Sequence, residues 1–268
     1  MPRLRRSVVV AALLLSTLAL APACQHNLPP IRFAPQGMDG DQLRNSFPLS
    51  DAERGSLTPD VLKEFTQAQI DQIYQRLSPG AIPDGPFRGD LFFPRGAARH
   101  QRIRDVAPSL PTELSALAAL PFERLGRVFW KGKVFFKSEG ILRNRIEDLI
   151  LLKGLIKDDA SIPKLTFDGQ TTWLLFPAQL SCGASILEPA RRAIVIDYSK
   201  GAQIAGYREV PDKLGGPEAL DIHDEVRVVR PGLYLGRAYF RGTFRLNFSL
   251  LKPPGEPGAP TDVHADCR

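Results

Sequence analysis

The sequence predicts a mainly β fold: an antiparallel β-barrel or strongly bent sheet of about eight strands, calycin-like, with N-terminal helices. From Phe87 onward, apolar or alternating segments follow one another and are joined mainly by turns. Strands and helices do not alternate regularly, which argues against a doubly wound parallel sheet. A barrel is favoured because closure removes the unpaired edges that an open sheet exposes.

The first predicted element is a helix over residues 66–77. Thr66 and Gln69 have the spacing of a capping box. Apolar residues then recur at helical spacing and form one face: Ile70, Ile73, Tyr74 and Leu77. The Ser-Pro-Gly sequence at 78–80 ends this helix, and a second helix is predicted over residues 112–120.

Eight later segments have the composition and periodicity of strands: 87–93, 129–137, 141–147, 171–176, 193–198, 222–229, 233–241 and 243–251. In the last one, Phe244, Leu246, Phe248 and Leu250 alternate with polar residues, so the four should share one buried face. Residues 148–157 interrupt the strands as a short apolar helix or strand that would cap one end of a barrel.

The chain divides into four predicted segments. Residues 1–23 have a cationic start, an apolar run and small residues at the end, as a signal peptide does. Residues 24–57 are rich in Pro and Gly and are predicted to form a tether. Residues 58–252 form a single β-rich domain with N-terminal helices, and residues 253–268 form a flexible tail.

Cys24 has two interpretations. In one, Ala21 and Ala23 mark an A-x-A cleavage site and the protein is released. In the other, residues 21–24 resemble the lipobox of bacterial lipoproteins, in which the cysteine carries a lipid. Lipidation of Cys24 would leave Cys182 and Cys267 to pair, since thiols tend to pair in an oxidising compartment. The predicted partner is then a membrane, reached through the lipid on Cys24.

Composition excludes several classes of protein. Removal of residues 1–23 removes Arg3, Arg5 and Arg6 and no acid, so the formal charge falls from +6 to +3. No run of five or more Lys or Arg occurs, and no nucleic-acid partner is predicted. G-x-S-x-G, H-E-x-x-H, phosphate-loop and C-x-x-C motifs are absent. With four histidines in the chain, no metal and no cofactor is predicted.

The densest polar cluster lies on the predicted strand 222–229. His223, Glu225 and Arg227 share one face and Asp224 lies on the other. His223, Asp224 and Glu225 are the candidates for a general base. Arg227 is a candidate ligand contact, because a guanidinium binds a carboxylate or phosphate through two parallel hydrogen bonds. The structural alternative is a solvated outer face.

Strand 141–147 carries a similar pattern. Arg143 and Arg145 share one face, whereas Asn144 lies on the apolar face. An unpaired buried amide costs about 1–3 kcal/mol, so Asn144 needs a backbone partner or a ligand. All three are candidate ligand contacts.

Aromatic residues on strands that should pass near one another could line a pocket or simply fill the core. These candidates are Trp130, Tyr198, Tyr234 and Tyr239, with Lys133 among them. Gly236 and Ala238 leave one face nearly bare, which makes room either for a cavity or for close packing.

Short motifs over roughly residues 60–250 resemble a family of uncharacterised exported bacterial proteins. They are residues 85–89, 129–133, Asn144, 193–198, 224–227 and 232–236. The overall strand pattern is similar to calycin-type barrels, the group that includes lipocalins. The second resemblance is architectural and implies a fold rather than a function.

Three functions are compatible with these features. The first is an exported, lipid-anchored envelope protein that binds an apolar or amphipathic small molecule in a barrel cavity, with arginines holding an acidic head group. The second is an enzyme that uses His223, Asp224 or Glu225 as general base in that cavity. The third is a structural or assembly lipoprotein that works through an exposed apolar patch.

Overall fold

The computed structural model describes residues 30–93, 102–106, 110–119, 121, 129–152, 155–156, 158–254, 256 and 262–267. The predicted signal peptide and Cys24 lie outside these residues. No helix among the described residues is long and apolar enough to cross a membrane.

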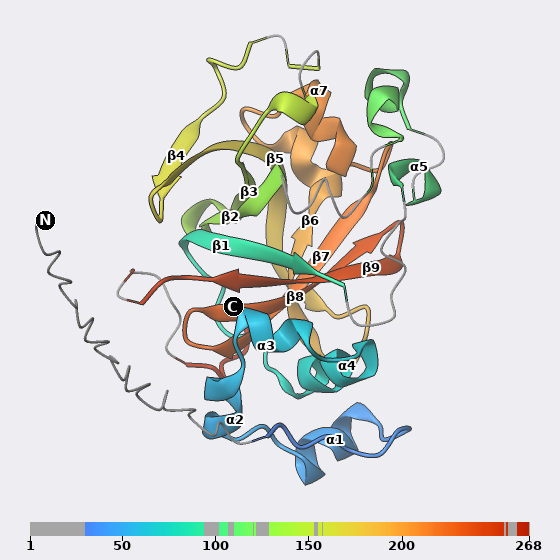
Figure 1. Ribbon diagram of the computed structural model, residues 1–268, viewed down its shortest axis with the longest axis vertical. Coiled ribbons are helices and arrows are strands. Elements are labelled where there is room, and N and C mark those ends of the chain that lie inside the picture. Colours follow the sequence, from blue (N-terminus) through green and yellow to red (C-terminus); the bar gives the residue numbers. More distant parts are fainter. Residues whose placement is uncertain are drawn as a thin grey trace, which may run out of the picture.

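Eight strands form a closed antiparallel ring in the order β3-β2-β1-β9-β8-β7-β6-β5, and pairing of β3 with β5 completes it (Figure 1). The prediction of an antiparallel barrel is confirmed. The strands are β1 (Gly85–Phe92), β2 (Trp130–Phe136), β3 (Ile141–Ile146), β5 (Gln170–Ala184), β6 (Arg192–Asp197), β7 (Ile222–Arg230), β8 (Leu233–Phe240) and β9 (Thr243–Leu251).

A ninth strand, β4 (Lys164–Phe167), was not expected. It pairs with the first part of β5 and lies outside the ring. β5 is therefore long: its first residues pair with β4, its middle with β3 and its last residues with β6.

Side chains alternate across the barrel wall as the period of two requires. On β7, Val226 and Val228 point into the main apolar core, while His223, Glu225 and Arg227 lie on the outer side. On β9 the expected pattern is interrupted, because the register with β8 shifts between Ala238 and Tyr239. This bulge turns Phe244 to the outer face, away from Leu246, Phe248 and Leu250.

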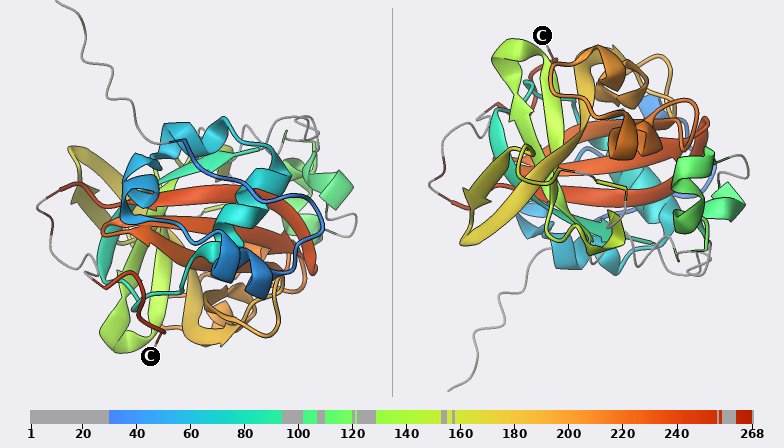
Figure 2. Two further views of the ribbon diagram at one scale, coloured as in Figure 1. Left: turned by 90° about the horizontal axis from the view of Figure 1, so that it is seen from below. Right: turned by 90° about the horizontal axis from the view of Figure 1, so that it is seen from above.

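Four short helices cover the outer face of β7, β8 and β9 (Figures 1 and 2). They are α1 (Gly40–Ser46), α2 (Asp51–Ser56), α3 (Pro59–Lys63) and α4 (Gln67–Arg76). A second apolar cluster joins them to the barrel wall: Leu49, Leu57, Leu62, Ile70, Ile73, Tyr74, Leu77, Phe92, Val229, Leu233 and Leu235.

The expectation of a tether over residues 24–57 is wrong for its described part. The side chains of Leu43, Leu49 and Leu57 are buried, and the Arg54 guanidinium donates to the Val229 carbonyl of β7 at 3.1 Å. Pro48 lies between α1 and α2, and Gly40 and Gly55 lie within these helices, so the prolines and glycines here do not mark a linker. Each helix has its own cap, and Ser50 with Glu53 forms a capping box on α2.

The predicted helix over residues 66–77 is present as α4, with both hydrogen bonds of the Thr66–Gln69 capping box. The segment predicted as helix 112–120 holds the 3₁₀ helix η1 (Thr112–Leu117). Within residues 148–157 the structure has the 3₁₀ turn η4 (Ile150–Leu152), which buries Leu152 and exposes Ile150. The remaining short elements are α5 (Ile103–Val106), η3 (Lys137–Glu139), η5 (Tyr198–Gln203), α7 (Glu209–Asp212) and η6 (Lys213–Gly215).

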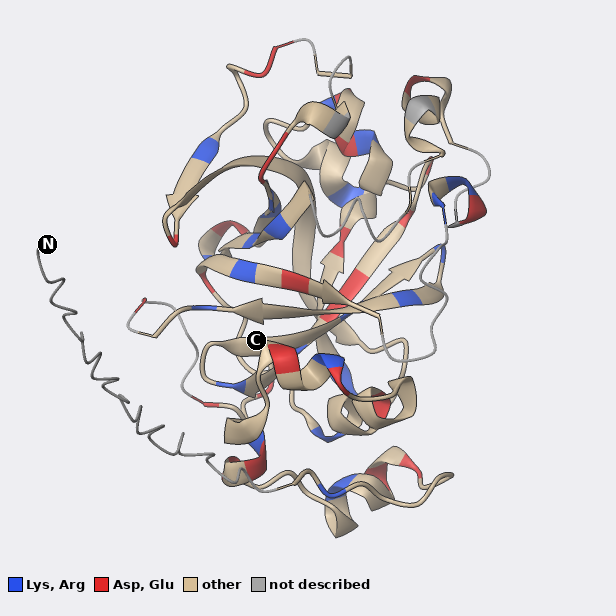
Figure 3. Ribbon diagram, viewed as in Figure 1, with Lys and Arg blue, Asp and Glu red and all other residues tan. Residues whose placement is uncertain are grey.

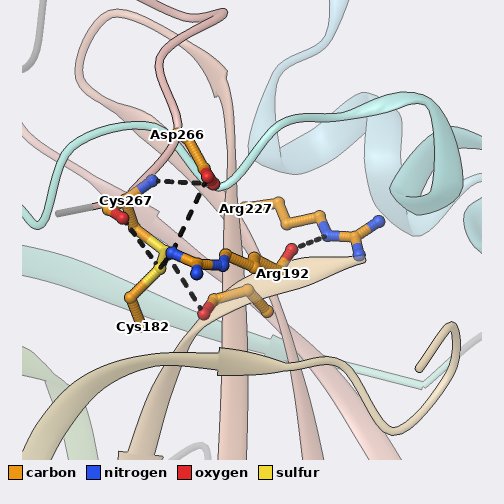
Figure 4. The surroundings of a disulfide bond; sticks show 6 residues. Cys182, Arg192, Arg227, Asp266 and Cys267 are labelled. Atoms are coloured by element: carbon orange, nitrogen blue, oxygen red, sulfur yellow. Dashed lines mark hydrogen bonds and ion pairs between the residues drawn. A yellow bond between two sulfur atoms is a disulfide. The ribbon is translucent and has the colours of Figure 1, made fainter. Parts of the chain in front are cut away.

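The end of the chain is attached to the barrel, which corrects the expectation of a flexible tail for residues 262–267. Cys267 is disulfide-bonded to Cys182 of β5, the pair expected from the cysteine count (Figure 4). The Gly80 amide donates to the Ala265 carbonyl at 3.0 Å. The tail therefore bridges β5 and the segment that follows α4.

The helical layer predicts a stability effect. Leu57→Ala should lower the free energy of unfolding by about 2–5 kcal/mol, because it leaves a cavity under the helices. Urea unfolding followed by circular dichroism measures this, and Ile150→Ala, at an exposed residue, is the control. Equal stability of the two variants would mean that residues 40–57 do not pack on the barrel.

The disulfide predicts a second effect. Replacement of Cys182 and Cys267 by Ser should lower the free energy of unfolding by about 2–5 kcal/mol, because the bond closes a long loop in the unfolded chain. The two cysteines are 85 residues apart. Alkylation of both thiols in the oxidised, unfolded protein without a reductant would contradict the pairing.

Candidate functional site

The barrel holds a partly open cavity of about 120 Å³. Its walls come from β1, β2, β3, β5, β7, β8 and β9, and Leu214, Gly215 and Leu220 add to the lining. Almost all the lining is apolar, with polar groups gathered in one place. The lining residues are Leu91, Phe129, Trp130, Lys133, Asn144, Ile146, Phe176, Tyr198, Leu214, Gly215, Leu220, Ile222, Asp224, Ala238, Phe240, Leu246 and Phe248.

Gly236 and Ala238 of β8 provide both the close packing and the space for a cavity that the sequence left as alternatives. A Cβ at Gly236 would lie 2.2 Å from the Phe248 ring, so the missing side chain lets that ring pack against the strand. Ala238, two residues later, lines the cavity. The small residues thus seat an aromatic wall and leave space beside it.

Lys133 is the centre of the polar end. Its Nζ lies 2.9 Å from Asp224 Oδ2, 2.6 Å from the Tyr198 hydroxyl and 3.1 Å from Asn144 Oδ1. These residues and Trp130 are named here the Lys133 cluster. Lys133 is 2% exposed and Asp224 is 4% exposed, so the two form a buried ion pair.

Barrel geometry brings the cluster together from separate strands. Lys133 on β2 is directly opposite Asn144 on β3, Asp224 is on β7, and Tyr198 follows β6. Figure 3 shows acidic residues within the barrel strands as well as on the covering helices. The Lys133 ammonium also lies 5.2–5.5 Å from the ring centroids of Trp130, Tyr198 and Phe248.

Asn144 holds the cluster in one arrangement. Its Nδ2 donates to the Phe176 carbonyl at 3.0 Å and to the Tyr198 hydroxyl at 2.9 Å. The carbonyl can only accept, which defines the orientation of the amide. Asn144 Oδ1 is then free to accept from Trp130 Nε1 at 2.8 Å and from Lys133.

Lys133 and Tyr198 keep their protons near neutral pH. Burial alone lowers the pKa of Lys133, but the Asp224 carboxylate and the Tyr198 hydroxyl outweigh burial, and the net pKa is raised. Burial raises the pKa of Tyr198 to about 12, against the opposing charge of Lys133. Lys133 is therefore an ammonium and Tyr198 a protonated phenol.

Two hydrogen-bonding positions in the cluster are left for another molecule. All three Lys133 protons and both Asn144 amide protons have acceptors in the cluster or at Phe176. The Tyr198 hydroxyl proton has only long contacts, 3.2 Å to Asn144 Oδ1 and 3.4 Å to Asp224 Oδ2. Asp224 Oδ1 accepts no hydrogen bond from any described residue. One donor and one acceptor thus remain beside the cavity.

The three predicted arginine contacts lie outside the cavity, which corrects the expectation that they hold a head group there. Arg143 donates to the Ala205 carbonyl. Arg145 donates to backbone carbonyls, including that of Phe87 at 3.3 Å. Arg227 donates to the carbonyls of Arg192 and Tyr74 and pairs with Glu188. Figure 4 shows the hydrogen bond from Arg227 to the Arg192 carbonyl. Because each points to the outer side of its strand, it joins the barrel wall to neighbouring segments.

Of the three candidate bases, only Asp224 lines the cavity. His223 and Glu225 lie on the outer side of β7, which corrects the expectation that either could serve as a general base in the cavity. Glu225 is fully buried there, and accepts from Ser185 Oγ at 2.8 Å and from the Ile186 amide. His223 Nε2 lies 3.9 Å from Glu225 Oε1.

The aromatic candidates divide in the same way. Trp130 and Tyr198 line the cavity. Tyr234 points into the core, but its hydroxyl donates to the Ala81 carbonyl at 3.0 Å. Tyr239 lies on the outer face and accepts from Arg237 Nε at 2.9 Å. The central role of Lys133 was not predicted. A usable signal exists in the sequence, because Lys133 is two residues from Phe135 on the same strand and therefore shares its inward face.

One group of metal-ligating side chains occurs among the described residues: Cys182, Asp266 and Cys267. The two cysteines of that group form the disulfide, so they supply no thiolate.

No protein-family model and no curated protein sequence matches this chain. Among solved structures, it is similar to the crystal structure of a protein from Thermomonospora curvata, with 20% identity and a TM-score of 0.36. The alignment covers 72% of this chain and 92% of that chain. Because the likeness is this distant, it carries no argument about function. The resemblances to an exported bacterial family and to calycins stay predictions.

The buried ion pair predicts a strong coupling. Lys133→Met should lower the free energy of unfolding by about 3–5 kcal/mol, since it leaves the Asp224 carboxylate buried without its cation. Adding Asp224→Leu should recover most of this loss. Lys131→Met, which removes a surface pair with Glu147, should cost less than about 1 kcal/mol. Additive losses in the double variant, measured by urea unfolding, would contradict the coupling.

Proposed function

We propose that the barrel binds a small, uncharged and mostly apolar molecule with one hydrogen-bonding group, which donates to Asp224 or accepts from Tyr198. The observation that carries this proposal is an apolar cavity whose polar end leaves one donor and one acceptor unused. Binding sites commonly combine apolar walls with a few convergent polar groups.

The size of the cavity limits the ligand. An engineered apolar cavity of about 150 Å³ is known to hold benzene, and this one measures about 120 Å³. A single small ring or a short branched chain therefore fits.

The charge balance of the cluster favours an uncharged ligand. The Lys133 ammonium already has the Asp224 carboxylate as its counter-ion at 2.9 Å. An acidic head group would bring a second negative charge into an apolar space, where an uncompensated charge is costly. A ketone, an aldehyde or an alcohol meets the remaining donor or acceptor without adding charge.

The proposal includes export and a lipid on Cys24, argued from the signal-like residues 1–23. Only residues 25–29 lie between Cys24 and the first described residue, Pro30. Because the helical layer begins shortly after that point, a lipid on Cys24 would hold the barrel close to a membrane surface. Small apolar molecules concentrate there.

A structural or assembly role has less support. The described residues expose two large hydrophobic side chains, Ile150 and Ile186. Ile150 lies in the segment where an apolar contact patch was expected, but the neighbouring Leu152 is buried. An isolated exposed side chain is ordinary on a protein surface.

Binding is testable with cyclohexanone, which puts one carbonyl on a ring close to benzene in size. Titration into ¹⁵N-labelled protein should shift the amide resonances of cavity residues, and Ala238→Leu should abolish the shifts by filling the space. Ala202→Leu, on the exposed surface, is the matched control and should bind as the wild type does. Unchanged binding in Ala238→Leu would mean that the cavity is not the site.

A further inference from the structure

We infer that the Lys133 cluster catalyses proton transfer on a small carbonyl compound. Asp224 Oδ1 takes a proton from the carbon beside the carbonyl, while the Tyr198 hydroxyl donates to the carbonyl oxygen. This inference rests on the proposed binding function and adds a reaction to it.

The two groups are placed for the two ends of such a reaction. Both hydrogen-bond to the same ammonium, Lys133 Nζ, at 2.6 Å and 2.9 Å, and the Tyr198 oxygen lies 3.4 Å from Asp224 Oδ2. In a ketone, the carbonyl oxygen and the neighbouring carbon are bonded to one common atom. The groups that contact them must therefore also be close neighbours, and both of these face the cavity.

A comparison within the chain singles out Asp224. The described residues include four buried carboxylates: Glu53, Asp212, Asp224 and Glu225. In the other three, both carboxylate oxygens accept hydrogen bonds from this chain. Asp224 alone has one oxygen that accepts from none of the described residues. A carboxylate that served only to neutralise Lys133 would be expected to resemble the other three.

The reaction balances without another reagent. The C–H bond breaks, its proton passes to Asp224, and its electron pair forms a C=C bond while the carbonyl electrons move onto the oxygen. The Tyr198 proton and the Lys133 charge behind it stabilise this enolate. Return of the proton to the same carbon regenerates the ketone. In a β,γ-unsaturated ketone, return to the γ-carbon gives the conjugated isomer.

The surroundings favour this chemistry. The cavity walls are apolar, so the ammonium and the phenol act at short range in a medium of low dielectric constant. Lys133 and Tyr198 keep their protons near neutral pH, as their raised pKa values require. Lys133 is a positioning residue, and Asp224 and Tyr198 are the catalytic residues.

Deuterium exchange tests the inference directly. Wild-type protein in D₂O with cyclohexanone should exchange the hydrogens beside the carbonyl faster than the buffer does, as followed by ¹H NMR. Asp224→Asn keeps the shape of the side chain but removes the base, so the enzymatic rate should fall by about 100-fold or more. Tyr198→Phe should lower the rate while cyclohexanone still binds.

Asp221→Asn is the matched control, because it makes the same change three residues earlier at a position outside the cavity lining. It should exchange at the wild-type rate. Binding is measured separately by the amide shifts for every variant, and circular dichroism verifies folding. If Asp224→Asn does not fold, Tyr198→Phe against the wild type decides the question.

The outcomes separate the two proposals. Binding of cyclohexanone with exchange no faster than in buffer would overturn the inference and leave the binding function standing. Equal exchange rates in the wild type and in Asp224→Asn would also overturn it, as would equal rates in the wild type and Tyr198→Phe if Asp224→Asn does not fold. Absence of cyclohexanone binding to the wild type would overturn both.

Discussion

Closure of the barrel by the pairing of β3 with β5 is the constraint on which the rest of the structure depends. In a closed antiparallel ring, each side chain of a strand points either into the barrel or to its outer surface. This alternation places Asp224 in the cavity and its neighbours His223 and Glu225 on the outer surface. Without closure, β3 would lie at a sheet edge and Asn144 would lose its hydrogen bonds to Phe176 of β5 and to Tyr198.

The outer face of β8 is as well covered as its inner face. All eight residues of β8 are buried, because α1 to α4 lie across the strands that surround it. Tyr74 of α4 is stacked against the guanidinium groups of Arg227 and Arg237 at 4.7 and 5.5 Å. Charged side chains thus join the helices to the barrel on a face that sequence alone suggests is open to solvent.

The interior and exterior polar clusters have different properties. Outside, Glu225 accepts from Ser185 and from the Ile186 amide, while Arg227 donates to backbone carbonyls and pairs with Glu188, which stabilises the contact between segments. Inside, the Lys133 cluster is neutral as a whole and leaves one donor and one acceptor beside an apolar space. A difference in hydrogen bonding, rather than in residue type, distinguishes the candidate site from the structural network.

The sequence by itself determined the local features. Period-two segments predicted the strands, the Thr66–Gln69 capping box predicted α4, and the strand parity put Asp224 and Asn144 on apolar faces. These depend on residues a few positions apart, where backbone geometry settles the outcome. The prediction of a tether was wrong because Pro and Gly also occur between and within short packed helices.

Only the tertiary structure decided which polar residues meet. Lys133, Asn144, Tyr198 and Asp224 come from different parts of the chain and converge through strand pairing. A bulge in β9 moves Phe244 out of the interior. Register, bulges and closure involve residues far apart in the sequence, so local periodicity carries no information about them.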